Sequence, residues 1–444
     1  MKIIIVGAGE VGRHLAKMLA NENQDIVLMD NDEERLEDLD TNYDLLTKIG
    51  SPTSIKDLEE SGVSEADLFI AVTPEESVNM TACMLATNLG AHKTLARINN
   101  YEYLLPKNRE FFEKLGVEHL IYPEMLAADE IVESLKTSWL RENTSFCSDA
   151  LTLLVIKVRD NSVIVNRAFS TGYFNHKKYR IVAIKRNNQT IIPIGSDMVL
   201  ADDIVYFMTT KEYLDFVREQ AGKIDVPLRN VMIMGGSRIA QKTIQKLPPH
   251  VKVKILERDR EKSFDLADKL TDTLIINCDG RNTELLKEEG IQDMDAFVAV
   301  TSNSEANILA CLAAKRLGVR KTIAEVENLD YIMLAENMDI SMVVNKKIIA
   351  ASYIYQLTLD ADVLNVRNLT ATDAEVVEFV VKPGSKITKS KIKDVRLPKQ
   401  VNIGGYVRDG KGYIVDGDTV IIPNDHVVIF CMSSAIRKIE HLFN

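Results

Sequence analysis

The sequence predicts an α/β fold that is built twice along one chain, and three observations support this. Short apolar runs alternate with segments of helical spacing, which is typical of a parallel, doubly wound sheet. The glycine turn Gly7–Gly12 follows the apolar run Lys2–Val6 directly, and a second turn, Gly235–Ala240, follows Val231–Met234. The offset between the turns, 235 − 7 = 228, is close to half of the 444 residues. The predicted architecture is two tandem copies of a Rossmann-like parallel-sheet domain, each followed by a small β-rich α+β domain.

The two halves stay in register after the glycine turns, which indicates a duplication. Asp67–Thr73 reads DLFIAVT, and Asp295–Thr301 reads DAFVAVT. Residues 79–103 and 307–331 are identical at eleven positions without a gap. The identical pairs are Asn79/Asn307, Ala82/Ala310, Cys83/Cys311, Ala86/Ala314, Leu89/Leu317, Gly90/Gly318, Lys93/Lys321, Thr94/Thr322, Ala96/Ala324, Asn100/Asn328 and Tyr103/Tyr331. The repeat unit is a whole domain pair, far longer than the period of a solenoid.

The elements of the first half follow from the spacing of its apolar residues. Helical spacing appears at Val11, Leu15 and Leu19, and an amphipathic helix over 123–136 is expected to leave the sheet. The strands expected in the parallel sheet are Ile3–Val6, Asp25–Met29, Leu45–Lys48, Leu68–Val72 and Thr94–Arg97. The strands expected in the β-rich part are Leu153–Val158, Ile181–Ile184, Thr190–Ile192 and Ile204–Met208, with a short helix over Lys211–Gln220.

Four domains are predicted from these patterns and from the repeat. Two nucleotide-binding domains are expected at 1–138 and 228–366. Each is followed by a β-rich domain, at 139–222 and at 367–444. A chain of 444 residues is too long for a single compact core, which agrees with this division.

Composition limits the classes of function. The chain has 46% hydrophobic and 27% charged residues, as an ordinary globular protein does. No apolar stretch reaches the length of a membrane span and no signal peptide precedes the first strand, so a cytoplasmic protein is expected. The net charge of −11 argues against nucleic acid as the main partner. Five cysteines without a CxxC pair indicate neither a disulfide framework nor a zinc site.

The first glycine turn has the setting of a dinucleotide-binding fingerprint: strand, turn, helix and a downstream acid. Small residues let the backbone approach a pyrophosphate, whose charge then lies at the helix N-terminus. Asp30 follows Gly7 by 23 residues (30 − 7) and is placed to accept hydrogen bonds from ribose hydroxyls. Because its charge opposes a 2′-phosphate, NAD(H) or an adenosine nucleotide such as ATP or ADP is favoured over NADP(H). The alternative is a degenerate domain kept for its fold.

Further residues of this first site stand at strand ends. The turn at Gly50–Ser51 can close over an adenine, and Thr73-Pro74 and Arg97 end the next two strands. Arg97 can form a forked contact with a phosphate, or alternatively a surface salt bridge. Thr73 can line the site or cap a helix. The predicted contact residues are Gly7, Ala8, Gly9, Glu10, Val11, Gly12, Asp30, Gly50, Ser51, Thr73, Pro74 and Arg97.

The second site repeats this layout with changes. Ser237 replaces the middle glycine, Ala240 replaces the last one, and Glu325 stands where Arg97 stands in the first half. Glu257 keeps the position of the ribose-binding acid. A second nucleotide site and a purely structural copy are both open. The predicted contact residues are Gly235, Gly236, Ser237, Arg238, Ile239, Ala240, Glu257, Cys278, Asp279 and Thr301.

No catalytic constellation emerges from the sequence. The seven histidines lie apart from one another, and none has a carboxylate at a spacing that suggests acid–base chemistry. A non-enzymatic sensor is therefore expected. The alternative is an NAD-dependent oxidoreductase, which would need a substrate domain with a proton donor. A nucleotide-binding scaffold unconnected with transport is a third interpretation.

The tandem order of these parts resembles the TrkA family. Its members are peripheral regulatory subunits of bacterial Trk potassium uptake systems and consist of RCK (KTN) domains. The resemblance rests on Gly7–Gly12, Asp30, Thr73 and Arg97, on the helix and β-rich domain that follow, and on the duplication. The segment 382–410 resembles the family's small domain, whereas Asp160-Asn161-Ser162 stands where that domain would have Pro-Gly.

The resemblance implies a function and a partner that the composition alone does not indicate. It implies a homotetrameric ring at the cytoplasmic face of the inner membrane, docked on a potassium-translocating membrane protein. NAD(H) or ATP and ADP would change the shape of the ring and so gate the transporter. Two unequal sites would let different nucleotides shift the equilibrium differently, since a ligand acts only through its differential affinity for two states.

Overall fold

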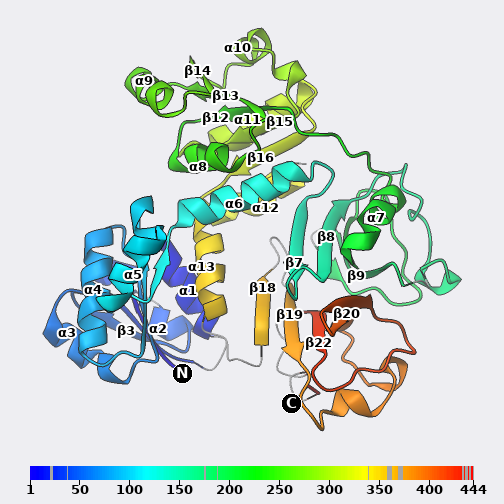
Figure 1. Ribbon diagram of the computed structural model, residues 1–444, viewed down its shortest axis with the longest axis horizontal. Helices are drawn as coiled ribbons and strands as arrows, with labels where there is room; N and C mark the ends of the chain where they lie inside the picture. The colour runs from blue at the N-terminus through cyan, green and yellow to red at the C-terminus, as the bar shows by residue number, and fades with distance from the viewer. Residues whose placement is uncertain are drawn as a thin grey trace. The chain divides into compact units, whose positions relative to one another are not determined.

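The computed structural model describes residues 1–20, 24–37, 39–174, 177–187, 189–338, 340–357, 363–368, 374–432, 435, 439 and 442–443 (Figure 1). These residues divide into two compact units. Unit 1 contains Met1–Ala128 and Asn345–Thr358, and unit 2 contains Asp129–Val344 and Leu359–Asn444.

Unit 1 is built on a six-stranded parallel sheet in the order β3-β2-β1-β4-β5-β6. Its strands are β1 (Lys2–Val6), β2 (Asp25–Asp30), β3 (Leu46–Ile49), β4 (Leu68–Ala71), β5 (Lys93–Arg97) and β6 (His119–Ile121). Its helices are α1 (Glu10–Ala20), α2 (Leu39–Asn42), α3 (Ile55–Glu60), α4 (Glu76–Asn88), α5 (Pro106–Lys114), the start of α6 (Pro123–Lys136) and α13 (Lys346–Leu357). The apolar run of β1 is fully buried because helices cover both faces of such a sheet.

The strand order reverses direction between β1 and β4. β1 pairs in parallel with β2 on one side and with β4 on the other. In open α/β sheets, ligands bind outside the carboxyl ends of the strands at such a switch point. The residues that follow β1, β3 and β4, and those that end β2 and β5, therefore meet at one edge.

Unit 2 contains the second parallel sheet, in the order β14-β13-β12-β15-β16-β17. The strands are β12 (Asn230–Met234), β13 (Lys252–Glu257), β14 (Leu274–Asn277), β15 (Ala296–Ala299), β16 (Lys321–Glu325) and β17 (Met342–Val344). The helices are α8 (Arg238–Lys246), α9 (Arg260–Lys269), α10 (Thr283–Glu288), α11 (Ser304–Arg316) and α12 (Leu329–Asn337). The order matches that of the first sheet strand for strand, as the duplication predicts.

Unit 2 also contains two antiparallel β-rich lobes. The first lobe has the order β10-β9-β11-β8-β7 and the second β18-β19-β22-β20-β21. The first comprises β7 (Glu142–Phe146), β8 (Leu151–Lys157), β9 (Tyr179–Arg186), β10 (Gln189–Ile191), β11 (Ile204–Thr209) and α7 (Leu214–Gln220). The second comprises β18 (Val363–Asn368), β19 (Ala374–Val380), β20 (Val401–Arg408), β21 (Lys411–Ile414) and β22 (His426–Met432).

The two lobes share one hydrophobic core. Phe146 and Tyr206 of the first lobe are buried in the same cluster as Val376 and Phe430 of the second. Tyr206 and Phe430 meet edge to face with ring centroids 5.6 Å apart. At the side of this core, Arg180 Nε donates to Asn402 Oδ1 over 2.9 Å. The lobes therefore form one packed body rather than two separate ones.

The long helices that follow the two parallel sheets do not stay with the sheets that they follow. Helix α13 belongs to unit 1 and packs against α1, and Lys347 forms an ion pair with Glu10 (Figure 1). From Asp129 onward, α6 belongs to unit 2, where Asp129 pairs with Lys246 of α8. The helix that follows the second sheet thus completes the first parallel-sheet body.

The predicted fold class is confirmed, with several elements that the sequence analysis did not identify. The predicted strands of the first sheet agree with β1–β5 to within one residue at each end. Strands β6 and β7 and helix α5 were not predicted. Strand β18 pairs with β19 of the second lobe, so the proposed boundary at 366 runs through it.

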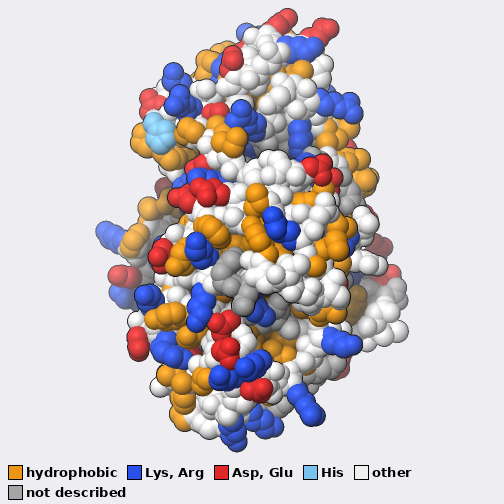
Figure 2. All heavy atoms as spheres, turned by 90° about the vertical axis from the view of Figure 1, so that its right-hand side faces the viewer, with side chains coloured by type: hydrophobic (Ala, Val, Ile, Leu, Met, Phe, Trp, Pro, Cys, Tyr) orange, Lys and Arg blue, Asp and Glu red, His pale blue; other side chains and the backbone are white. Residues whose placement is uncertain are grey.

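The described surface carries charges of both signs. Figure 2 shows one face on which basic and acidic side chains are interspersed, with hydrophobic side chains between them. Within the described part of the chain, no helix has the length and apolar character required to cross a membrane.

Candidate functional site

The first glycine loop (Gly7–Gly12) is held against the sheet by close backbone approaches. Gly7 has φ +103°, and a Cβ there would lie 2.9 Å from the Thr73 amide nitrogen. A Cβ at Gly12 would lie 1.9 Å from the carbonyl oxygen of Gly7. A Cβ at Gly9, in contrast, would meet no described atom within 4 Å. Gly7 and Gly12 are therefore required by the fold, and Gly9 leaves open space in front of the loop.

The carboxylate of Asp30 fixes the loop to the end of β2. The Ala8 amide donates to Asp30 Oδ2 over 2.6 Å, and the Asp32 amide donates to Oδ1 over 3.0 Å. The guanidinium of Arg35 lies 3.8 Å from Oδ2. Each carboxylate oxygen can accept more than one hydrogen bond, so Asp30 keeps acceptor capacity for a ribose hydroxyl.

Asn79, which the sequence analysis did not place in the site, links two of the predicted site residues. Its Nδ2 donates to the carbonyl oxygens of Thr73 and of Arg97, each over 2.9 Å. Its Oδ1 accepts from the Thr73 amide over 2.9 Å and from the Thr73 hydroxyl over 2.7 Å. Asn79 is fully buried on α4 and joins the ends of β4 and β5. The sequence did contain a signal for this role, because the same asparagine recurs as Asn307 in the second half.

Arg97 has an unsatisfied donor at this edge. Its side chain is half-buried at the end of β5, and its Nε is buried without a hydrogen-bond partner in the described structure. A buried unpaired donor of a charged group is costly unless a ligand completes it. This geometry fits an anion better than the alternative of a surface salt bridge.

The remaining predicted residues of the first site occupy two turns and the start of α1. The Gly50 amide donates to the Asp30 carbonyl over 3.0 Å, and the Ser51 amide donates to Asp57 Oδ2 over 2.8 Å. The Pro74 carbonyl accepts from Asn99 Nδ2 over 3.0 Å. The side chains of Ala8 and Val11 are buried, so only their backbone can face a ligand. Glu10 is exposed and paired with Lys347.

The second glycine loop (Gly235–Ala240) is held in the same way, by a carboxylate that accepts backbone hydrogen bonds; we call this arrangement the carboxylate lock. The Gly236 amide donates to Glu257 Oε2 and the Asp259 amide to Oε1, each over 2.9 Å. Lys262 Nζ lies 2.9 Å from Oε2. Burial acts to raise the pKa of Glu257, but the hydrogen bonds from Asp259, Lys262 and Gly236 outweigh it and hold the pKa below its ordinary value. The charged form is therefore built into the folded loop.

The buried asparagine bridge is also repeated. Asn307 Nδ2 donates to the carbonyl oxygens of Thr301 and Glu325, each over 2.8 Å. Its Oδ1 accepts from the Thr301 hydroxyl over 2.6 Å. Gly235 has φ +97°, close to the value at Gly7. The scaffold of the two loops is thus the same.

The positions of the second half that correspond to Gly9 and Arg97 differ from those of the first. Ser237 caps α8, its hydroxyl accepting from the Ala240 amide over 3.3 Å. A Cβ at Gly236 would lie 2.1 Å from Leu266 Cδ1, so Leu266 packs directly on the loop. Glu325, at the position of Arg97, is a carboxylate buried to 3% exposure. These features make the second loop less open to a pyrophosphate.

The other predicted residues of the second site make contacts within the protein. The Cys278 amide donates to the Glu257 carbonyl over 3.1 Å, and Asp279 pairs with Arg281 over 2.5 Å. Ile239 and Ala240 are buried, and Arg238 is exposed at the start of α8. The structure brings these residues to one sheet edge, and no ligand is needed to explain their contacts.

Comparison with known protein families gives two matches, each in duplicate. The TrkA-N domain model matches residues 3–123 and 231–346. The TrkA-C domain model matches residues 153–222 and 376–444. The first model covers the two parallel-sheet regions and the second covers the two β-rich lobes.

Full-length relatives carry the same family name. A Trk system potassium uptake protein TrkA of Haemophilus influenzae is 35% identical, covering 100% of this chain and 99% of that protein. The protein of the same name from Vibrio alginolyticus is 32% identical over the same shares. A TrkA homologue of Methanosarcina mazei is 30% identical, and the match covers both chains completely.

Solved structures with the same fold come from the GsuK channel. The GsuK RCK domain aligns with a TM-score of 0.59 at 14% identity, over 100% of this chain and 94% of that one. The GsuK channel bound to NAD aligns with a TM-score of 0.58 at 14% identity, over 100% and 78% of the two chains. At this level of identity the likeness shows the fold.

Proposed function

The chain belongs to the TrkA family, and on that premise we propose that it is a nucleotide-binding regulatory subunit that gates a Trk-type potassium-translocating membrane protein. The observation that carries the nucleotide part is the edge of the first sheet. There the loop position Gly9 faces open space and the buried Arg97 Nε lacks a partner. Both features suit a phosphate group beside the N-terminus of α1.

Each predicted residue then has a part in holding the nucleotide. Gly7–Gly12 present backbone amides to the pyrophosphate, and Arg97 supplies a cation to a phosphate. Asp30 accepts a hydrogen bond from the ribose, and Gly50–Ser51 border the adenine. Thr73 and Pro74 close the edge beside them. NAD(H), ATP and ADP are the ligands to test first, because structures of the GsuK channel are described as bound to NAD and to ADP.

The second loop is proposed as a weaker or differently selective site, with Gly235–Ala240, Glu257, Cys278, Asp279 and Thr301 as its border. Ser237 and Leu266 narrow the loop, and Glu325 opposes phosphate charge. We expect the second site to hold a nucleotide with fewer phosphates than the ligand of the first site, or to hold no nucleotide. Unequal sites allow two ligands to pull the assembly toward different states.

The proposal extends to the assembly and its place. The four regions 1–138, 139–222, 228–366 and 367–444 act as alternating nucleotide-binding and β-rich domains. Several copies, most simply four, form a ring on the cytoplasmic face of the inner membrane beside the potassium-translocating subunit. The relatives are named as potassium uptake proteins, which supports this partner. The protein carries no chemistry of its own in this proposal.

Calorimetric titration of the full chain with NADH, NAD, ATP and ADP tests the nucleotide part. We expect Gly9→Val to abolish tight binding while the protein stays folded, because a side chain there meets only open space. Gly195→Val is the matched control, since a Cβ at Gly195 also meets nothing closer than 3.9 Å and lies outside the site. Unchanged binding in Gly9→Val would refute the assignment of the loop.

Potassium flux into liposomes that contain the membrane partner tests the regulatory part. We expect the flux to depend on this protein and on the nucleotide added. The outcome against the proposal is a flux indifferent to both. Steady turnover of NADH by the protein alone would favour the oxidoreductase alternative instead.

A further inference from the structure

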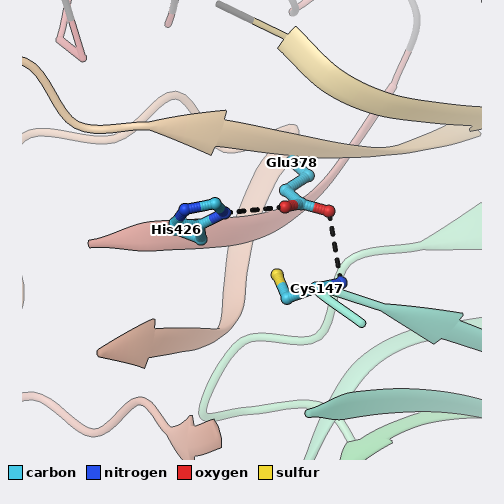
Figure 3. A group of neighbouring side chains, drawn as sticks. All are labelled: Cys147, Glu378 and His426. Carbon is cyan, nitrogen blue, oxygen red and sulfur yellow. Dashed lines mark hydrogen bonds and ion pairs between the residues drawn. The ribbon is translucent and has the colours of Figure 1, made fainter. Parts of the chain in front are cut away.

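Three side chains that bind transition metals meet where the two β-rich lobes pack together. Cys147 directly follows β7 of the first lobe, Glu378 lies on β19, and His426 begins β22 of the second lobe. One ligand atom from each residue, the sulfur, a carboxylate oxygen and an imidazole nitrogen, lies within 4.8 Å of the other two. Figure 3 shows the three side chains gathered between these elements.

Glu378 is the centre of this group. Its side chain is 3% exposed, and its Oε1 lies 2.9 Å from His426 Nδ1. Its Oε2 accepts from the Cys147 amide over 3.3 Å. The His426 side chain is 36% exposed, so the group is open to solvent on one side. A buried carboxylate with a neighbouring thiol and imidazole is the donor set of a borderline-soft divalent cation.

The duplication shows that Glu378 and His426 occur only in the second lobe and are not part of the scaffold that the two lobes share. Arg186 pairs with Asp203 in the first lobe, and Arg408 pairs with Asp425 in the second, each with a contact of 2.7 Å. The next residue is Ile204 in the first lobe and His426 in the second.

The position of Glu378 differs in the same way. Val428 pairs with Glu378 across β22 and β19, as Tyr206 pairs with Val155 across β11 and β8. The first lobe therefore has valine and isoleucine where the second has glutamate and histidine. A buried charge in place of a buried valine lowers stability unless a partner compensates it.

We propose that Cys147, Glu378 and His426 bind one zinc-class divalent cation at the junction of the two lobes. In tetrahedral zinc geometry, ligand oxygen and nitrogen atoms about 2.0–2.1 Å from the metal stand about 3.3 Å apart. The observed 2.9 Å between His426 and Glu378 needs only a small opening for this. The sulfur, about 2.3 Å from the metal, would stand about 3.5 Å from the other two ligand atoms, which side-chain rotation can reach.

Binding of the cation releases one proton, that of the Cys147 thiol. The Cys147 thiol loses its proton to solvent and binds as thiolate, and the coordinating imidazole nitrogen binds in its neutral form. Water fills the fourth position on the exposed side of His426. The cation would connect residue 147 of the first lobe to residues 378 and 426 of the second, and would stabilise their packing because it binds only the folded arrangement.

Titration of the EDTA-treated full chain with Co²⁺ tests the proposal, because a cobalt–thiolate bond gives a near-ultraviolet charge-transfer band. We expect this band to saturate at one equivalent and Zn²⁺ to displace Co²⁺. Cys147→Ser should remove the band. His426→Gln, a change at a partly exposed strand end, should weaken binding by at least about tenfold, the scale on which even outer-shell changes act.

Cys278→Ser is the matched control, because Cys278 is the other partly exposed free cysteine of the described chain. Cys278→Ser should change neither the charge-transfer band nor the affinity for Co²⁺. Saturation without a thiolate band, or a band that Cys278→Ser removes, would mean an adventitious ion only. Undiminished affinity in both Cys147→Ser and His426→Gln would overturn the site as well. Zn²⁺ should also raise the thermal transition of the unaltered chain, and an unchanged transition at saturating Zn²⁺ would contradict the link between the lobes.

Discussion

In the first glycine loop Gly9 faces open space, whereas Ser237 at the same place in the second loop turns its hydroxyl onto the Ala240 amide. Beside them, Arg97 leaves a donor unsatisfied and Glu325 is a buried acid. Yet in both loops a backbone amide donates to a carboxylate at the end of the second strand of its sheet, Asp30 in the first half and Glu257 in the second.

The comparison separates the residues that fold the loop from those that we propose to contact a nucleotide. The carboxylate lock and the buried asparagine are kept in both halves because each satisfies several backbone groups that would otherwise be buried unpaired. The positions that face outward carry no such constraint. They have diverged, and that divergence is where a difference in ligand preference can arise.

The largest expected effect is on folding, at the last loop position, which is Gly12 in one half and Ala240 in the other. Gly12→Ala should destabilise unit 1 by about 3 kcal/mol or more, the upper end of the cost of overpacking, because the new Cβ would overlap the Gly7 carbonyl. Ala240→Gly should cost only about 1 kcal/mol, the propensity difference within a helix. Hydrogen exchange of peptides from β1 and α1 measures the first change. Equal small losses in both variants would show that the two loops are packed alike.

Lys93 and Lys321 give the next contrast, since Lys93 is exposed and Lys321 is fully buried with its Nζ donating to the Leu140 carbonyl over 2.5 Å. Burial, with a smaller effect of the Arg141 charge, lowers the pKa of Lys321 to about 7. Between that value and the ordinary pKa the unfolded chain binds a proton that the folded chain does not. Stability should therefore rise with pH above about 7, by up to about 1.4 kcal/mol per unit.

Lys321→Met should remove this rise, and Lys93→Met should leave it in place. Urea unfolding at several pH values between 7 and 9 measures the difference between each variant and the unaltered chain. A slope that persists in Lys321→Met would assign the pH dependence to other groups.

The third contrast concerns affinity. Arg97→Ala should weaken nucleotide binding by about 1.5–3 kcal/mol, the range for a hydrogen bond to a charged group. It should not weaken the fold, because the removed Nε has no partner in the described structure. Glu325→Ala should leave nucleotide affinity unchanged or increase it. Isothermal titration calorimetry with ADP measures both, and equal losses would contradict the proposed asymmetry.

These contrasts also show what the sequence could predict. The parallel sheet, both loops and the acids Asp30 and Glu257 follow from local signals: an apolar run, a glycine turn and a fixed spacing. The lock itself was not predicted in its observed form, because the sequence suggests a ribose ligand and not a hydrogen bond to the Ala8 amide. Asn79 was visible as a repeated residue, but its bridge needs the spatial adjacency of β4 and β5.

Contacts between distant segments were beyond the sequence analysis for the same reason. The group formed by Cys147, Glu378 and His426 brings together residues 231 and 48 positions apart. The expectation that no zinc site was indicated came from the absence of a CxxC pair, which detects only ligands that are close in sequence. Likewise, no local pattern in the sequence indicates that α13 packs against α1 or that Leu266 covers Gly236.

The smallest expected effect tests whether the carboxylate lock contributes equally to the free energy of unfolding in the two halves. Glu257→Gln should lower the free energy of unfolding by about 1–2 kcal/mol at neutral pH, because an amide replaces a carboxylate that accepts two backbone hydrogen bonds. The folded pKa of Glu257 is lowered, so its contribution is present above the unfolded value of about 4.3 and is lost as the pH falls through the folded value. The variant and the unaltered chain should therefore converge in stability as the pH falls below the lowered pKa of Glu257. Asp30→Asn is the matched change in the first loop, where the carboxylate makes the same two kinds of contact. Urea unfolding of both variants at pH 7 compares them, and a gap that stays constant at acid pH would show that the charge of Glu257 contributes nothing to its loop.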